Sequence, residues 1–155
     1  HNEREVGGEP VADLRIRYAP LKGIDIPIEA VPLAIDELPA VLIAAACAQG
    51  VTVLRGAEEL RVKESDRIAS MAEGLSQLGI ENRVQPDGIE VVGGEMTGGV
   101  ITTHHDHRIA MSFAIAALRA SDRIKVSDCA HVATSFPGFA ELAVQTGLRL
   151  EAAEE

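Results

Sequence analysis

The chain has 155 residues, 46% of them hydrophobic and 25% charged, which is the composition of one globular domain with a core of its own. Its net charge of -10 and its 3% of aromatic residues argue against a nucleic-acid-binding surface. No apolar run approaches the roughly 18 residues that a membrane-spanning helix needs. Cys47 and Cys129 stand at no metal-type spacing, so we expect reduced thiols in a cytoplasmic protein.

Residues 1–10 are polar, and the sequence begins with His1 rather than Met, so we expect a lead-in from an upstream region of a longer protein. Beyond them, hydrophobic periodicity and turn residues predict alternating strands and helices. The predicted elements are a strand at 12–19, an extended piece at 23–28, a helix at 36–48, a strand at 51–55, a charged loop at 56–64, a helix at 66–78, a hairpin at 80–84 and 88–92, an extended piece at 100–102, a helix at 107–119, a strand at 124–126, a helix at 137–146 and a strand at 148–150. Ser65 is the expected N-cap of the second helix.

This order of elements recurs when the sequence is compared with itself at an offset of 70 residues. The matched pairs are Asp36 with Asp106, Ala40 with Ala110, Ala44 with Ala114, Ala46 with Ala116, Val62 with Val132, and Ser65 with Ser135. A two-residue shortening in the last helix then aligns Gly79 with Gly147. Chance matches occur in an Ala-rich chain, but the agreement with the element order favours a true repeat. The unit is βαβαβ with one more strand expected, which implies an α/β fold with parallel strands and right-handed crossovers.

Three unusual clusters lie at predicted helix starts, namely residues 35–39, 61–67 and 104–108. Two of them place an arginine, Arg67 or Arg108, in the first helical turn, where unpaired N–H groups and the helix dipole already present positive charge. A cation is locally unfavourable there. The pattern therefore fits a site in which both arginines and the helix N-termini face an anion.

Local ion pairs would explain the same two arginines without any ligand. Arg67 would then pair with Asp66 or with a carboxylate one turn on, and Arg108 with Asp106. The sequence leaves the choice between an anion site and local pairing open.

Two carboxylates are candidates for proton transfer. Glu64 would act as a general acid or base if it is partly buried, but beside Lys63 it also fits a solvated loop carboxylate. Asp36 precedes a helix, where an aspartate is most often an N-cap. The run 104–107 contains three histidines, but adjacent ligands are geometrically awkward and no partner pair has zinc-like spacing. We therefore expect no metal.

Four motifs resemble those of the 5-enolpyruvylshikimate-3-phosphate synthases. Arg61–Arg67, with the sequence Arg-Val-Lys-Glu-Ser-Asp-Arg before an amphipathic helix, is similar to the most distinctive motif of that family. Asp106–Met111, with the sequence Asp-His-Arg-Ile-Ala-Met, is similar to its second hallmark. Asp36–Pro39 and Thr134–Pro137 also match in order and spacing, and the resemblance runs from about Val11 to Leu150.

The resemblance implies an α/β fold of repeated βαβαββ units, an inside-out α/β barrel, of which this chain is part of the C-terminal domain. The expected units are residues of about 11–95 and 96–155, after the lead-in at 1–10. Substrates of the family bind in a cleft between two domains. The N-terminal domain is expected to be missing, so this fragment alone is expected to be inactive.

The activity implied is transfer of the enolpyruvyl group from phosphoenolpyruvate to the 5-hydroxyl of shikimate 3-phosphate with release of phosphate. This is a step of aromatic amino acid biosynthesis that needs no metal or organic cofactor. The resemblance makes Asp36 the acceptor of the hydroxyl proton and Glu64 the donor of a proton to the methylene carbon. The residues it implies for substrate binding are Asp36, Lys63, Arg67, His107 and Arg108.

Two positions depart from the pattern of some family members. Thr134 stands where some carry a lysine, and Glu59 where some use an asparagine near shikimate 3-phosphate, which fits the family's other sequence subgroup. Two alternatives stay open: an enolpyruvyl transferase for another acceptor, and a non-catalytic anion-binding or scaffolding module. A partial domain is also expected to expose apolar surface and so to dimerise or to be marginally stable.

Overall fold

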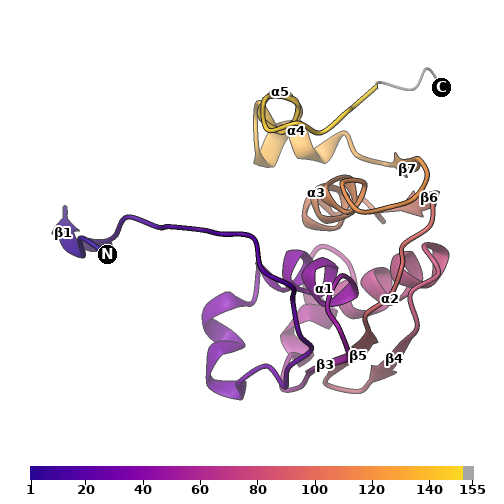
Figure 1. Cartoon of the computed structure of the whole chain (residues 1–155), viewed down its shortest axis with the longest axis horizontal. Coiled ribbons are helices and arrows are strands. Elements are labelled where there is room, and N and C mark those ends of the chain that lie inside the picture. Colours follow the sequence, from indigo (N-terminus) through magenta and orange to yellow (C-terminus); the bar gives the residue numbers. More distant parts are fainter. Residues whose placement is uncertain (152–155) are drawn as a thin grey trace.

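The computed structural model describes residues 1–151 and alternates short strands with helices along the chain (Figure 1). The helices are α1 (Leu38–Ala46), α2 (Arg67–Gln77), α3 (His107–Ala116), α4 (His131–Ser135) and α5 (Phe139–Gln145), with 3₁₀ helices η1 (Ile28–Ala30), η2 (Pro32–Ala34) and η3 (Glu58–Val62). The strands are β1 (Arg4–Val6), β2 (Glu9–Val11), β3 (Val51–Leu54), β4 (Asn82–Gln85), β5 (Gly88–Val92), β6 (Gly99–Thr102) and β7 (Ile124–Ser127).

Two parallel pairings are each connected by a segment that contains a helix. The extended segment before η1 runs parallel to β3, with bridges from Lys22 to Gln49 and from Asp25 to Val53, and α1 lies in the connection. β6 runs parallel to β7, and α3 lies in that connection. Strands β3, β5 and β4 form an antiparallel sheet in that order, which includes the predicted hairpin. The chain therefore has the strand–helix–strand arrangement of an α/β fold.

The ends of α2 and α5 repeat the same backbone geometry. Gly79 follows α2 with a φ of 79°, and Gly147 follows α5 with a φ of 105°. After α2, the N–H of Ile80 bonds back to Leu75, and after α5 the N–H of Leu148 bonds back to Ala143, five residues earlier in both cases. Both closures place glycine in the left-handed region, where it carries no side-chain penalty. These two glycines are the pair that the sequence comparison aligned.

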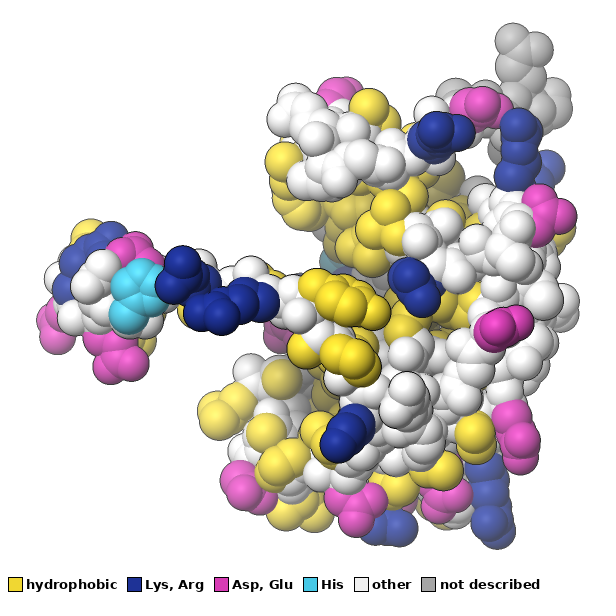
Figure 2. Space-filling view, in the orientation of Figure 1, with side chains coloured by type: hydrophobic (Ala, Val, Ile, Leu, Met, Phe, Trp, Pro, Cys, Tyr) yellow, Lys and Arg dark blue, Asp and Glu magenta, His cyan; other side chains and the backbone are white. Residues whose placement is uncertain are grey.

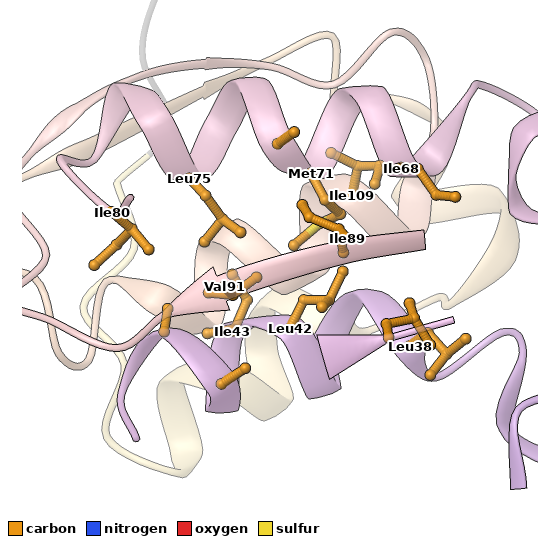
Figure 3. Close-up of a cluster of buried hydrophobic side chains, with 14 of the residues drawn as sticks. Leu38, Leu42, Ile43, Ile68, Met71, Leu75, Ile80, Ile89, Val91 and Ile109 are labelled. Carbon is orange, nitrogen blue, oxygen red and sulfur yellow. The ribbon is translucent and has the colours of Figure 1, made fainter. Parts of the chain in front are cut away.

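The core lies between α1, α2, α3 and the antiparallel sheet. Figure 3 shows side chains of α1, α2 and β5, together with Ile109 of α3, pointing toward one another. The predicted apolar stripe of α2 is buried, and its members are Ile68, Met71, Leu75 and, just past the helix, Leu78. Gly74 of α2 faces the ring of Phe113 in α3 with no room for a side chain between them. This contact brings α2 and α3 together, and with them the two arginine-bearing helix starts.

The predicted strand at 12–19 is wrong, because the structure assigns no strand there. Its alternating apolar residues Leu14, Ile16 and Tyr18 are exposed. Alternation specifies a strand only where a neighbouring chain supplies the ladder hydrogen bonds. Among the described residues, only Asp13 of this segment has such backbone bonds, and its partner is His1. The segment follows the β1–β2 hairpin, which the sequence did not predict and which lies apart from the other elements in Figure 1.

Four smaller expectations near the helices also differ from the structure. No strand forms at 148–150, and α4 was not predicted. The charged loop at 56–64 contains the 3₁₀ helix η3. The N-cap of α2 is Asp66, whose carboxylate accepts the Ala69 N–H at 3.0 Å, and not Ser65. The hydroxyl of Ser65 donates instead to the carboxylate of Asp106.

Apolar side chains are exposed around the C-terminal helices. Figure 2 shows hydrophobic side chains gathered between those helices and the rest of the molecule. The exposed large hydrophobic residues from α3 onward are Ile115, Leu118, Phe136, Leu142, Val144 and Leu150. Exposed apolar surface was expected, whereas dimerisation through it stays a prediction. No described helix is both long enough and apolar enough to cross a membrane.

Candidate active site

Arg67, the first residue of α2, is the centre of a cluster of carboxylates. Its side chain is 1% exposed, and its Nε donates to Oδ2 of Asp106 at 2.8 Å. Its Nη1 donates to Oδ1 of Asp36 at 3.0 Å, and its Nη2 to Oε2 of Glu64 at 2.5 Å. Each acid comes from a different segment, so the fold brings the three sequence clusters to one place.

Asp106 is the N-cap of α3, and its side chain is 0% exposed. Its Oδ1 accepts the backbone N–H groups of Arg108 at 2.9 Å and of Ile109 at 3.4 Å. Its Oδ2 accepts the Ser65 hydroxyl at 3.1 Å in addition to Arg67. One buried carboxylate thus satisfies the start of α3 and the arginine at the start of α2.

The buried pair is ionised at neutral pH. Burial by itself raises the pKa of Asp106, but the hydrogen bond and charge of Arg67, with the bonds from Arg108 and Ser65, lower it below its ordinary value of 3.8. Burial likewise lowers the pKa of Arg67, but the hydrogen bond and charge of Asp106 raise it above its ordinary range. Both groups therefore stay charged inside the protein.

Asp36 lies just before α1 but does not cap it. The N-cap of α1 is Glu37, and no side chain bonds there. The Asp36 carboxylate instead faces three cations, with Oδ1 3.0 Å from Arg67 and 3.9 Å from Lys63, and Oδ2 3.5 Å from Arg108. The N-cap interpretation of Asp36 is therefore wrong, and Asp36 is one of the carboxylates clustered around Arg67.

Arg108, the second residue of α3, reaches across to the segment before α1. Its Nη1 donates to the backbone oxygen of Asp36 at 2.9 Å and lies 3.5 Å from Oε1 of Glu37. Its side chain is 30% exposed, so it can still meet a ligand. His107, the residue before it, is half-buried at the first position of α3.

Local pairing accounts for only one of the three ion pairs of Arg67. Asp66 binds Arg61 at 2.8 Å rather than Arg67, and Arg61 also donates to the carbonyls of Gln85 and Pro86 in the hairpin turn. Arg67 keeps one near partner, Glu64, three residues before it. Its other partners, Asp36 and Asp106, are distant in sequence, so the cluster is a tertiary site.

A protein-family model described as EPSP synthase (3-phosphoshikimate 1-carboxyvinyltransferase) matches residues 2–142. The chain belongs to the EPSP synthase family. It is 66% identical over 148 residues to the 3-phosphoshikimate 1-carboxyvinyltransferase of Methylococcus capsulatus, covering 96% of this chain and 34% of that relative. It is 63% identical over 150 residues to the same enzyme of Alkalilimnicola ehrlichii, covering 96% of this chain and 34% of that relative.

A solved structure of EPSP synthase from Acinetobacter baumannii superposes with a TM-score of 0.94 at 54% identity, covering 99% of this chain and 36% of that one. The EPSP synthase fold expected from the motifs is therefore confirmed. The chain spans about a third of the length of the curated relatives it matches. The division into units at 11–95 and 96–155 stays a prediction.

A shallow depression of about 350 Å³ lies beside Glu64 on the surface of α2. Its lining residues are Glu64, Ser65, Asp66, Ala69, Ser70, Glu73 and His104. Glu64 has a side chain that is 49% exposed, so it can reach solvent or a ligand while it bonds to Arg67. Among residues 1–151, no group of three or more His, Cys, Asp or Glu side chains is arranged to hold a metal ion.

Glu59 and Thr134, the two positions that depart from the family pattern, lie in different surroundings. Lys63 lies beside Asp36 and also bonds to Glu59, one of the two departures from the family pattern. Thr134, the other departure, lies exposed in α4. The rings of His105 and His131 pack edge to face with centroids 5.3 Å apart. This contact shows that the start of α4 lies next to the loop before α3.

Sequence reasoning missed the role of Asp106 as the buried partner of Arg67. The aspartate before a predicted helix does indicate an N-cap. Its second partner lies 39 residues away, however, and no local pattern links the two.

Proposed function

We propose that this chain supplies part of an active site that transfers the enolpyruvyl group of phosphoenolpyruvate to the 5-hydroxyl of shikimate 3-phosphate and releases phosphate. The observation that carries the proposal is the convergence of Asp36, Glu64, Arg67 and Arg108 at the starts of three helices. The names of the relatives support this reaction class. In the whole protein, the remaining two thirds would complete the site, and the reaction would take place in the cytoplasm.

The arginines suit an anion with a carboxylate and a phosphate. Arg67 directs both η nitrogens toward carboxylates that are only partly buried, with Asp36 41% and Glu64 49% exposed. A ligand anion can take the place of one of these carboxylates on the same nitrogens, since guanidinium groups bind carboxylate and phosphate with the same donors. Arg108 adds a second cation, and the N-termini of α2 and α3 add partial positive charge.

The two exposed acids suit the two proton transfers of the reaction. As the hydroxyl oxygen of the acceptor bonds to C2 of phosphoenolpyruvate, Asp36 takes the hydroxyl proton and Glu64 gives a proton to C3. The product of this step is a tetrahedral intermediate. Phosphate then leaves C2 with its share of electrons, the Glu64 carboxylate takes back a proton from the new methyl group, and the double bond of the enol ether forms.

Lys63 and His107 complete the proposed binding set. The Lys63 ammonium lies 3.9 Å from the Asp36 carboxylate, so it would contact an anionic acceptor that places its hydroxyl at Asp36. His107 lies at the start of α3, next to Arg108, and would contact the same substrates. No metal or organic cofactor is part of the proposal.

One observation favours the non-catalytic alternative. Arg67 is buried, and its Nε, Nη1 and Nη2 atoms each already bond to a carboxylate. A purely structural arginine would have the same contacts. A transferase with another acceptor is the other alternative, because this chain contributes only part of the acceptor site.

The test is phosphate release from phosphoenolpyruvate by the whole protein, with and without shikimate 3-phosphate. We expect release that depends on shikimate 3-phosphate, and Arg108→Ala should raise the KM for phosphoenolpyruvate by about tenfold or more. Arg123→Ala, at an arginine that is 88% exposed, is the control and should leave that KM unchanged. A folded wild-type protein that releases no phosphate, or that needs a different acceptor, would overturn the proposal.

A further inference from the structure

The three carboxylates around Arg67 are of two kinds. Asp36 and Glu64 are 41% and 49% exposed, and each holds one η nitrogen. Asp106 is 0% exposed and holds Nε. A ligand can reach the first two acids, but it cannot displace the third without opening the core.

Asp106 also has no oxygen left for chemistry. Oδ1 accepts two backbone N–H groups, and Oδ2 accepts the Arg67 Nε and the Ser65 hydroxyl. A carboxylate with both oxygens occupied and no exposed surface is a poor proton carrier. Its contacts instead fix the geometry of other groups.

The groups that Asp106 fixes are the two arginines proposed to bind phosphoenolpyruvate. It holds the guanidinium of Arg67 directly, and it holds the backbone from which Arg108 extends. These arginines lie on different helices, α2 and α3, and Asp106 contacts both. Movement of this carboxylate would therefore change the distance between the two cations.

The loop before Asp106 carries backbone strain. His104 and His105 are consecutive non-glycine residues with φ values of 52° and 60°, in the left-handed region that side chains disfavour. The strained turn is held by the Thr103 side chain, which donates to the Asp128 carbonyl at 2.9 Å, and by the Asp106 N–H, which bonds to the Thr103 carbonyl at 3.0 Å. Such strain is kept where a specific placement matters.

We propose that Asp106 is a positioning residue for phosphoenolpyruvate binding, which sets the spacing and orientation of Arg67 and Arg108 without touching the substrate. This inference rests on the proposed function. It assigns the acid a role apart from the proton transfers of Asp36 and Glu64. When the ligand takes the place of one of those two acids, the bond from Nε to Asp106 still holds Arg67 in position.

The test compares Asp106→Asn with Asp66→Asn in the whole protein. Asparagine caps helices about as well as aspartate, so both variants keep their caps and lose one charge. Of the two aspartates, Asp66 caps α2 and pairs with Arg61, whereas Asp106 bonds to Arg67. We expect Asp106→Asn to raise the KM and the calorimetric Kd for phosphoenolpyruvate by about tenfold or more. The KM for shikimate 3-phosphate should stay within about threefold, and Asp66→Asn should change neither by more than that.

Two results would overturn the positioning role. One is equal phosphoenolpyruvate affinity in the two variants. The other is a parallel rise in the KM of both substrates, which is the sign of a merely structural defect. If Asp106→Asn does not fold, Ser65→Ala removes one bond to the same carboxylate and should raise the phosphoenolpyruvate KM by about threefold. No change in that variant would likewise overturn the role.

Failure of the proposed function gives a different result. A wild-type protein that binds phosphoenolpyruvate but releases no phosphate overturns the proposed reaction, while the Kd comparison still decides the role of Asp106. A wild-type protein that binds no phosphoenolpyruvate overturns both.

Discussion

The Nε atom of Arg67 donates a 2.8 Å hydrogen bond to Oδ2 of Asp106, and neither side chain is more than 1% exposed. This pair joins the N-terminus of α2 to that of α3. It also explains how an arginine is tolerated in the first turn of a helix, where the dipole disfavours a cation. The buried charge is compensated by an acid that another helix start holds in place.

Arg67→Ala should lower the free energy of unfolding by about 3–5 kcal/mol, because it leaves the Asp106 carboxylate buried without its cation. Arg108→Ala should cost only about 1 kcal/mol, because that side chain is partly exposed, its ion pairs are 3.5 Å long, and it loses one hydrogen bond, to the Asp36 carbonyl. Urea unfolding of the two variants measures the difference. Equal losses would contradict the structural account of the pair.

Loss of phosphoenolpyruvate binding in Arg67→Ala would then have two causes, the loss of a ligand contact and the loss of stability. Arg67 is buried, so it has a structural role in the free protein whether or not it also binds a ligand. Arg108 is therefore the cleaner position for a test of anion binding.

Stability should depend on pH through Asp106. Its pKa in the folded protein lies below the ordinary 3.8, so the stabilisation that it provides is present above that value and is lost as the pH falls through the folded pKa. The difference in unfolding free energy between wild type and Asp106→Asn should be constant from about pH 7 to pH 5 and shrink below about pH 4. A difference that grows on acidification would contradict this sign.

Gly74→Ala should destabilise the protein, although alanine is the better helix former by about 1 kcal/mol. A Cβ at this position would lie 2.2 Å from the Cζ atom of Phe113, so α2 and α3 must separate or the ring must move. We expect a net loss of about 1–3 kcal/mol in urea unfolding. The double variant Gly74→Ala with Phe113→Leu should lose less than the sum of the two single changes, since the second change makes room. A single variant as stable as wild type would rule out the tight contact.

Much of the fold could be predicted because the signals are local. The stripe of Ile68, Met71 and Leu75 predicted α2 from its period alone, and the turn residues before Gly88 predicted the β4–β5 hairpin. The motifs located three helix starts, and the structure brings those starts together around Arg67.

The remaining features depend on partners distant in the sequence. Residues 12–19 have the alternation of a strand but no described strand beside them. Asp36 looked like a helix cap until its contacts with Arg67 and Arg108 were known. The contacts of Arg67 with one buried acid and two partly exposed acids likewise depend on tertiary structure, so no local sequence pattern predicts them.

The most direct test of the proposed site is the rate of phosphate release by the whole protein carrying Glu64→Gln, measured with phosphoenolpyruvate and shikimate 3-phosphate. Glu73→Gln is the matched control, because Glu73 lines the same depression and pairs with His104 but has no bond to Arg67. The account predicts a loss of about 100-fold or more for Glu64→Gln, the scale of a lost general acid, and little change for Glu73→Gln. Equal rates in the two variants would contradict the role of Glu64 in proton transfer.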